Sequence, residues 1–183
     1  ESGIDNQLYR VLGCSRFYRG PDGTYYIFAD KYARDFRFNR SMIEITNVDD
    51  LANDNDVDVT IHRGLDRLMQ DASGNRIMPG GTEHIDTRFA KKFEAHLKGK
   101  IVNGVLTTDP ADVYWMWSCF GGVPGGEVFR GMRLNLKLTP EGATGMIAGY
   151  ADVENFYKHI IGCQSTHHLS YGQLSAIGLY HSL

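Results

Sequence analysis

The sequence VFRGMRLNLKLTPEGATGMIAGY, residues 128–150, decides the fold of this chain. The TPEG segment at residues 139–142 is typical of a β-turn, because proline fixes φ and glycine accepts left-handed backbone. We therefore predict that residues 128–138 and 143–150 form the two strands of a hairpin. This hairpin indicates an antiparallel β-protein, and the rest of the chain is interpreted from it.

Further strands are predicted where apolar residues alternate with polar ones. The clearest is residues 57–62, where Val57, Val59 and Ile61 fall on one face. We also predict a hairpin turn at residues 71–75. A second hairpin is predicted from residues 89–97 and 101–107, with its turn at 98–100 and Gly104 as a bulge or a point of close backbone approach. Other β-branched, aromatic or alternating segments are predicted strands: residues 24–28, 36–39 and 42–46.

Two short helices are predicted near the C-terminus. Asp152 can cap a helix through residue 161, and Ser170 can cap a second one. With several hairpins before them, the expected fold is an antiparallel β-sandwich or barrel of about eight to ten strands. The 183 residues are expected to form a single β-rich domain, 1–183.

Composition excludes some classes of partner. The chain is 42% hydrophobic and 22% charged with a net charge of −3, so it has no overall attraction for nucleic acid or anionic membranes. No apolar stretch approaches the roughly 20 residues that span a bilayer, so no membrane span is predicted. Arg and aromatic residues interleave between residues 10 and 40, but a half-buried strand shows the same pattern, and nucleic acid is not an expected partner.

The compartment is predicted to be periplasmic or extracellular. The sequence starts Glu1-Ser2-Gly3 without Met, as a processed exported chain does, although a cloning boundary gives the same start. Of the three cysteines, we expect a disulfide between Cys119 and Cys163. The alternative, three buried reduced thiols, stays open.

One metal-ligand pattern lies near the C-terminus. His159, Cys163 and His167, with His168 beside the last, are four residues apart, so on one helix they could converge on a transition metal or haem iron. Gly162 argues against a continuous helix. The alternative is surface histidines around a buried or bridged cysteine.

A second candidate metal site is acidic. Asp54, Asp56 and Asp58 have the spacing of carboxylates in calcium loops. However, Val59 stands where such a loop needs glycine, and Leu65 where it needs a bidentate glutamate. A solvated acidic loop explains the residues equally, so calcium or a transition metal remains a possible cofactor without an assigned one.

Aromatic residues before a glycine-rich segment mark a candidate ligand site. Tyr114, Trp115 and Trp117 lead into residues 121–126, which contain four glycines. Such a loop can form a ligand platform. It can equally close the hydrophobic core or lie against a partner subunit.

The sequence contains none of the common catalytic motifs that we sought, including a GxSxG elbow, a phosphate-binding loop and HExxH. Whether the protein is an enzyme stays open, with a non-catalytic role favoured. The expected function is an exported binding or assembly protein, a structural subunit with protein partners or self-assembly. Its expected contacts are the aromatic, glycine-rich loop and residues 160–183, which carry no charge. The alternative is a metal or haem protein that uses the C-terminal His and Cys residues.

Overall fold

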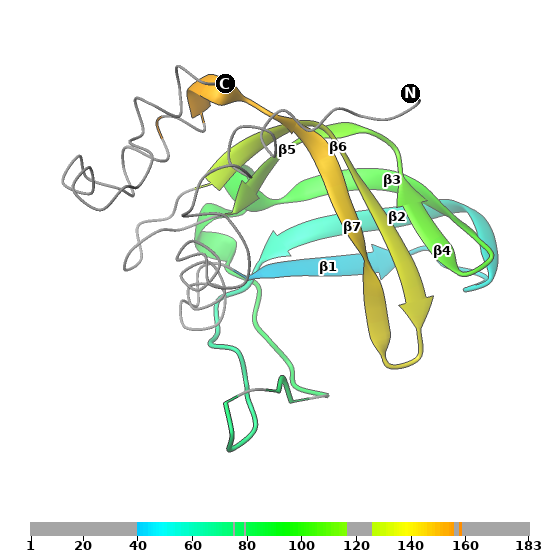
Figure 1. Ribbon diagram of the computed structural model, residues 1–183, viewed down its shortest axis with the longest axis horizontal. Helices are drawn as coiled ribbons and strands as arrows, with labels where there is room; N and C mark the ends of the chain where they lie inside the picture. Colours follow the sequence, from blue (N-terminus) through cyan, green and yellow to red (C-terminus); the bar gives the residue numbers. More distant parts are fainter. Residues whose placement is uncertain (1–39, 75, 79, 117–125, 156–157, 159–183) are drawn as a thin grey trace, which may run out of the picture.

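The computed structural model describes residues 40–74, 76–78, 80–116, 126–155 and 158. These residues form a mainly β fold with one seven-stranded antiparallel sheet (Figure 1). The strands are β1 (Ser41–Thr46), β2 (Asn53–Arg63), β3 (Ala95–Val102), β4 (Val105–Thr108), β5 (Ala111–Met116), β6 (Gly126–Thr139) and β7 (Gly142–Ala151). The antiparallel prediction is confirmed. The described strands form an open sheet, and neither a second sheet nor a closed barrel is found among them.

The strands follow one another across the sheet as a meander. β1 pairs with β2, β2 with β3, and β3 with β4. β4 and β5 then pair with successive parts of one edge of β6, since Leu136 lies opposite Leu106 and Met132 opposite Ala111. β7 pairs with the other edge of β6, because Leu136 also lies opposite Gly145. Among the described residues, three strands therefore pair along one edge alone: β1, β5 and β7.

One hydrophobic core joins strands that are far apart in this order. Val57, Val59 and Ile61 of β2 are buried, as their alternation predicts, in the same cluster as Met132 and Leu134 of β6. The sheet must therefore bend over itself. Register shifts interrupt β2, β5 and β6, and such bulges bend strands. Figure 1 shows the β6–β7 hairpin crossing steeply over β1 and β2.

The β6–β7 hairpin confirms the turn predicted at residues 139–142, but the turn predicted at 98–100 is wrong. β3 runs straight through these residues, and the chain reverses at Asn103 and Gly104, whose φ angles are both positive, at 51° and 75°. Gly99 instead allows close strand contact, because a Cβ there would lie 2.9 Å from the carbonyl oxygen of Thr107.

Helical structure also differs from the prediction. The one α-helix among the described elements is α3 (Ala90–Phe93), which follows the 3-10 turn η2 (Thr87–Phe89) where a strand was predicted. Near the C-terminus, residues 153–155 and 158 are helical, and the Asn155 backbone N–H donates to Asp152 Oδ1 at 2.9 Å, as expected for a cap. The helix predicted from Ser170 lies outside the described residues, as do the strands predicted at 24–28 and 36–39. None of the described helices is long and apolar enough to cross a membrane.

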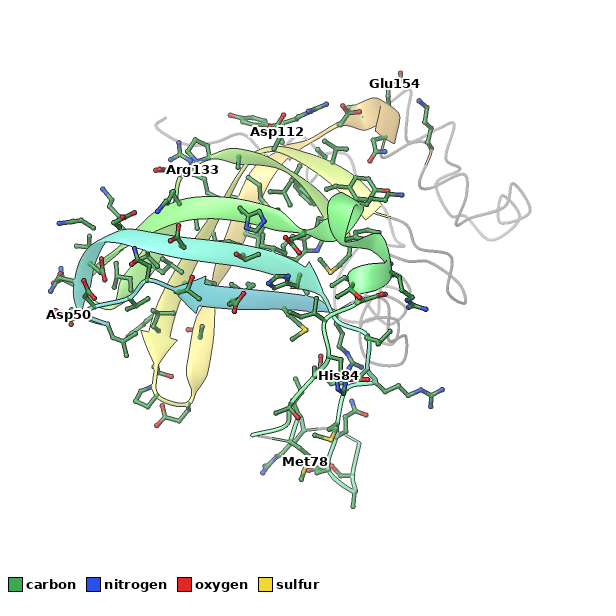
Figure 2. The ribbon with its side chains drawn as sticks, turned by 180° about the vertical axis from the view of Figure 1, so that it is seen from behind. Asp50, Met78, His84, Asp112, Arg133 and Glu154 are labelled. Carbon is green, nitrogen blue, oxygen red and sulfur yellow. The ribbon has the colours of Figure 1, made fainter. Side chains whose placement is uncertain are left out.

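Between β2 and β3 the chain makes an excursion that we call the arm, residues 65–85. It projects away from the sheet, with Met78 far from the strands and His84 nearer to them (Figure 2). A bridge between Gln70 and Ile77, and a hydrogen bond from the Asp71 N–H to the Arg76 carbonyl at 3.0 Å, reverse the chain where a turn was predicted. The flanking residues are not regular strands.

Candidate binding surface

The largest exposed apolar strand of the described fold is β7. All ten of its residues, GATGMIAGYA, are exposed, and none carries a charge. It pairs with β6 from Thr139 opposite Gly142 to Phe129 opposite Ala151. No other strand in the described ranges pairs with it, so the backbone N–H and C=O groups of its outer edge have no partner strand there. We call residues 142–151 the β7 edge.

Both faces of β7 are apolar. Met146 and Ile147 are 71% and 44% exposed and, as neighbours along a strand, point to opposite faces. Tyr150 is 65% exposed. An exposed apolar surface of this kind marks a contact site more often than a solvated one.

Small residues seat β7 tightly against β6. A Cβ on Gly145 would collide with the backbone carbonyl of Asn135, and one on Gly149 would lie 3.1 Å from Met132 Cα. The glycines therefore serve the pairing with β6, while the larger side chains of β7 are left for contacts elsewhere.

A charged cluster anchors the base of the arm. Asp86 is fully buried and accepts hydrogen bonds from Arg88 Nε at 2.8 Å and from Arg63 Nε at 3.1 Å. The guanidinium of Arg63, at the end of β2, also lies 4.4 Å from the ring centre of Phe93. The hydrogen bonds from Arg88 and Arg63 hold the pKa of Asp86 well below its ordinary value, so Asp86 remains a carboxylate. The cluster fixes the arm to β2.

Arg40 ties the two sides of the arm to the chain just before β1. Its Nη1 donates to the Asp66 carbonyl at 2.7 Å and to Glu83 Oε1 at 3.0 Å. Burial lowers the pKa of Arg40, an effect that the carboxylates of Glu83 and Asp66 oppose. These contacts are those of a structural brace.

A row of ionisable side chains crosses β1, β2 and β3 on the face away from the core. His62 Nε2 lies 3.0 Å from Glu44 Oε2, and its Nδ1 lies 3.7 Å from Glu94 Oε2. Glu94 in turn contacts His96 Nε2 at 2.9 Å. In the part of the chain that the structure describes, no three His, Cys, Asp or Glu side chains gather to hold a metal ion. The contacts of the row link β1 to β2, and β2 to the start of β3.

The aspartates proposed for calcium have other partners. Asp54 accepts hydrogen bonds from the backbone N–H groups of Asp49 at 2.7 Å and Asp56 at 3.1 Å, which lower its pKa. Asp56 and Asp58 both contact Lys98 Nζ, at 2.8 and 2.7 Å, and raise the pKa of that ammonium group. An internal cation thus occupies the position between two of the three carboxylates, and calcium binding stays a prediction without geometric support.

Tyr114 and Trp115 were predicted to lie in a loop, but the structure places both in strand β5. Both are half-buried and pack against the core, and the Tyr114 ring lies 5.4 Å from that of Phe93. The reason is that β5 pairs with β6 as far as Met116, which lies opposite Gly126. Their position agrees with the alternative interpretation, a segment that closes the core, and a ligand role for them stays a prediction.

The other predicted site residues lie outside the described residues: Trp117, Cys119, His159, Cys163, His167 and His168. The predicted disulfide and the predicted metal or haem site therefore stay predictions. Sequence reasoning, in turn, missed the exposure of β7. The available signal was ten consecutive uncharged residues in a chain with 22% charged residues.

Comparison with known proteins gives no match: no family model, no curated protein and no solved structure is significantly similar to this chain.

Proposed function

We propose that this protein is a non-catalytic, exported binding or assembly protein, and that the β7 edge is its contact site. The observation that carries the proposal is an edge strand of ten residues, exposed on both faces and without any charge. Two further features support it. The Met146 and Tyr150 side chains are exposed, and within the described ranges β6 is the one strand that pairs with β7.

The physical reason lies in how sheet proteins protect their edges. Edge strands of monomers are usually short, bear lysine or proline, or are covered, since an open edge pairs readily with another strand. β7 has none of these protections in the described structure. An open, apolar edge is suited to strand addition, in which backbone hydrogen bonds give affinity and side-chain contacts give specificity.

The arm offers a second, different apolar surface. Met69, Ile77 and Met78 are 50%, 66% and 48% exposed on it. Flexible methionines suit adaptable contacts, but the arm is not a regular strand and has no comparable row of backbone groups. The proposal therefore assigns recognition to β7 and uses the arm as its control.

Strand addition can be tested with a labelled peptide. We expect a fluorescein-labelled peptide with the sequence of residues 142–151, flanked by lysines for solubility, to bind the protein with a rise in fluorescence anisotropy. Met146→Lys should weaken this binding about tenfold or more, because it adds a charge to the apolar edge. Met78→Lys, which adds the same charge to the arm, should leave the binding unchanged.

A peptide that does not bind, together with a protein that stays monomeric, would contradict the proposed function. Loss of binding in Met78→Lys but not in Met146→Lys would move the contact from β7 to the arm.

Export makes a separate prediction about the cysteines. We expect non-reducing proteolysis and mass spectrometry of protein isolated from its native source to yield a peptide pair that joins Cys119 and Cys163. The same digest after reduction is the control. Three alkylatable thiols in the unreduced protein would argue against an oxidising compartment and leave the binding role untouched.

A further inference from the structure

We propose that the partner of the β7 edge is the β7 edge of a second copy of this chain, in antiparallel pairing about a two-fold axis near Met146. This rests on the proposed function and deepens it by naming the partner. The result is a dimer in which the two sheets join into one.

Self-pairing is favoured by the composition of the strand. Antiparallel pairing of two identical strands places each side chain opposite a residue of the same segment, so a charge within β7 would meet charges of its own kind or lose hydration. β7 has no charge from Gly142 to Ala151. Beyond its C-terminal end, Asp152 is already within 3.5 Å of Arg130 Nη2, so its charge is compensated within one copy.

The two-fold axis follows from sheet geometry. In antiparallel pairing, directly opposite residues point to the same face of the sheet. A two-fold axis that relates the two strands is therefore perpendicular to the sheet, and one residue of each strand lies opposite its own copy. Met146 lies next to the midpoint of the strand and is its most exposed large side chain. Centring on Met146 sets Tyr150 opposite Gly142, which gives the tyrosine ring room, and sets Thr144 opposite Ala148.

The other strands with an unpaired edge fit a second copy less well. β5 is buried or half-buried except at Asp112, whose carboxylate contacts Arg130. β1 has only six residues, is half-buried over much of its length, and carries Glu44, which contacts His62. Pairing of β1 with β7 would also be head-to-tail and would generate rings or open filaments instead of a closed dimer. The uncharged β7 edge therefore favours the two-fold arrangement.

Edge pairing of ten-residue strands buries less surface than the roughly 1,600 Å² of a standard stable interface. We therefore expect dissociation constants in about the micromolar range. The test is sedimentation velocity and light scattering of the full chain from about 1 to 500 µM. The wild type should pass from monomer to dimer over this range.

Substitutions at the axis make the test specific. Met146→Lys should weaken dimerisation about tenfold or more, because two like charges then face each other. Met78→Lys is the matched control on the arm and should dimerise like the wild type. Met146→Glu alone should dimerise as weakly as Met146→Lys, whereas an equimolar mixture of the two variants should form a mixed dimer more tightly than either variant alone, because opposite charges then meet.

The outcomes separate the partner from the function. A wild type that is monomeric throughout overturns self-pairing, and if the labelled β7 peptide still binds, the edge serves a different strand and the proposed function stands. A dissociation constant of Met146→Lys equal to that of the wild type, or no gain on mixing the two Met146 variants, overturns the two-fold pairing near Met146. Filaments or higher oligomers would instead indicate head-to-tail pairing and overturn the closed dimer.

Discussion

Asp86→Asn is expected to lower the free energy of unfolding by about 3–5 kcal/mol, because it leaves a buried arginine without its counter-charge. Asp86 is fully buried, and Arg63 beside it is 1% exposed. Asparagine keeps the volume of the side chain, but it removes the charge and replaces one of the two accepting oxygens with a donor. The measurement is urea denaturation followed by far-UV circular dichroism.

Two further variants make this expectation decisive. Arg88, the other partner of Asp86, is 52% exposed, so Arg88→Gln should cost far less stability than Asp86→Asn. If Asp86→Asn does not fold, the double variant Arg63→Met/Asp86→Leu should fold, because replacing both buried charges with apolar groups removes the uncompensated charge. Equal losses in Asp86→Asn and Arg88→Gln, or a double variant no more stable than Asp86→Asn, would contradict the importance of the buried pair.

The second large expected effect is a loss of stability as pH rises, and it comes from Glu127 in β6. Burial raises the pKa of Glu127 from 4.5 to about 7. Because the folded state holds this proton more tightly than the unfolded state, the contribution is complete below pH 4.5 and is lost as pH rises to about 7. The expected loss is about 3 kcal/mol, at 1.36 kcal/mol for each unit of pKa.

The test compares the free energy of unfolding at pH 5 and pH 8 for the wild type and Glu127→Gln. The variant should lack the part of the pH dependence that comes from Glu127. Its free energy of unfolding should therefore rise relative to that of the wild type as pH increases. Glu141→Gln, in the exposed β6–β7 turn, is the matched control and should follow the wild type. Asp86 does not interfere with this comparison. Because its pKa is lowered, its contribution to stability is constant at pH 5 and above and is lost only as the solution becomes more acidic. Parallel profiles for the wild type and Glu127→Gln would contradict burial as the cause.

Local patterns predicted the strands whose side chains simply alternate. Val57, Val59 and Ile61 identified β2, and the proline and glycine at residues 139–142 identified the β6–β7 hairpin. The β3–β4 hairpin was misplaced because residues 98–100 resemble a turn. There, glycine serves close contact with Thr107, and the real turn is the Asn103-Gly104 pair, a strong hairpin signal that had been interpreted as a bulge.

Much of the candidate site depended on contacts between segments that are distant in the sequence. Arg63 and Asp86 are 23 residues apart, and only the return of the chain along the arm brings them together. The sequence of β7 contains one signal, its ten consecutive uncharged residues, but the exposure of the strand depends on which element lies beside it. Tyr114 and Trp115 were assigned to a loop because glycines follow them, whereas pairing with β6 determines their structure.

Because of the way in which the arm joins the sheet, the length of the arm does not affect how β2 and β3 pair. At its base, the Asp86 N–H donates to the Arg63 carbonyl at 2.7 Å and the Leu65 N–H to the His84 carbonyl at 2.8 Å. The chain therefore enters and leaves the arm at adjacent points, and β2 and β3 stay in register whatever lies between. Such a closed junction lets evolution lengthen, shorten or replace the inserted segment without refolding the strands that carry it.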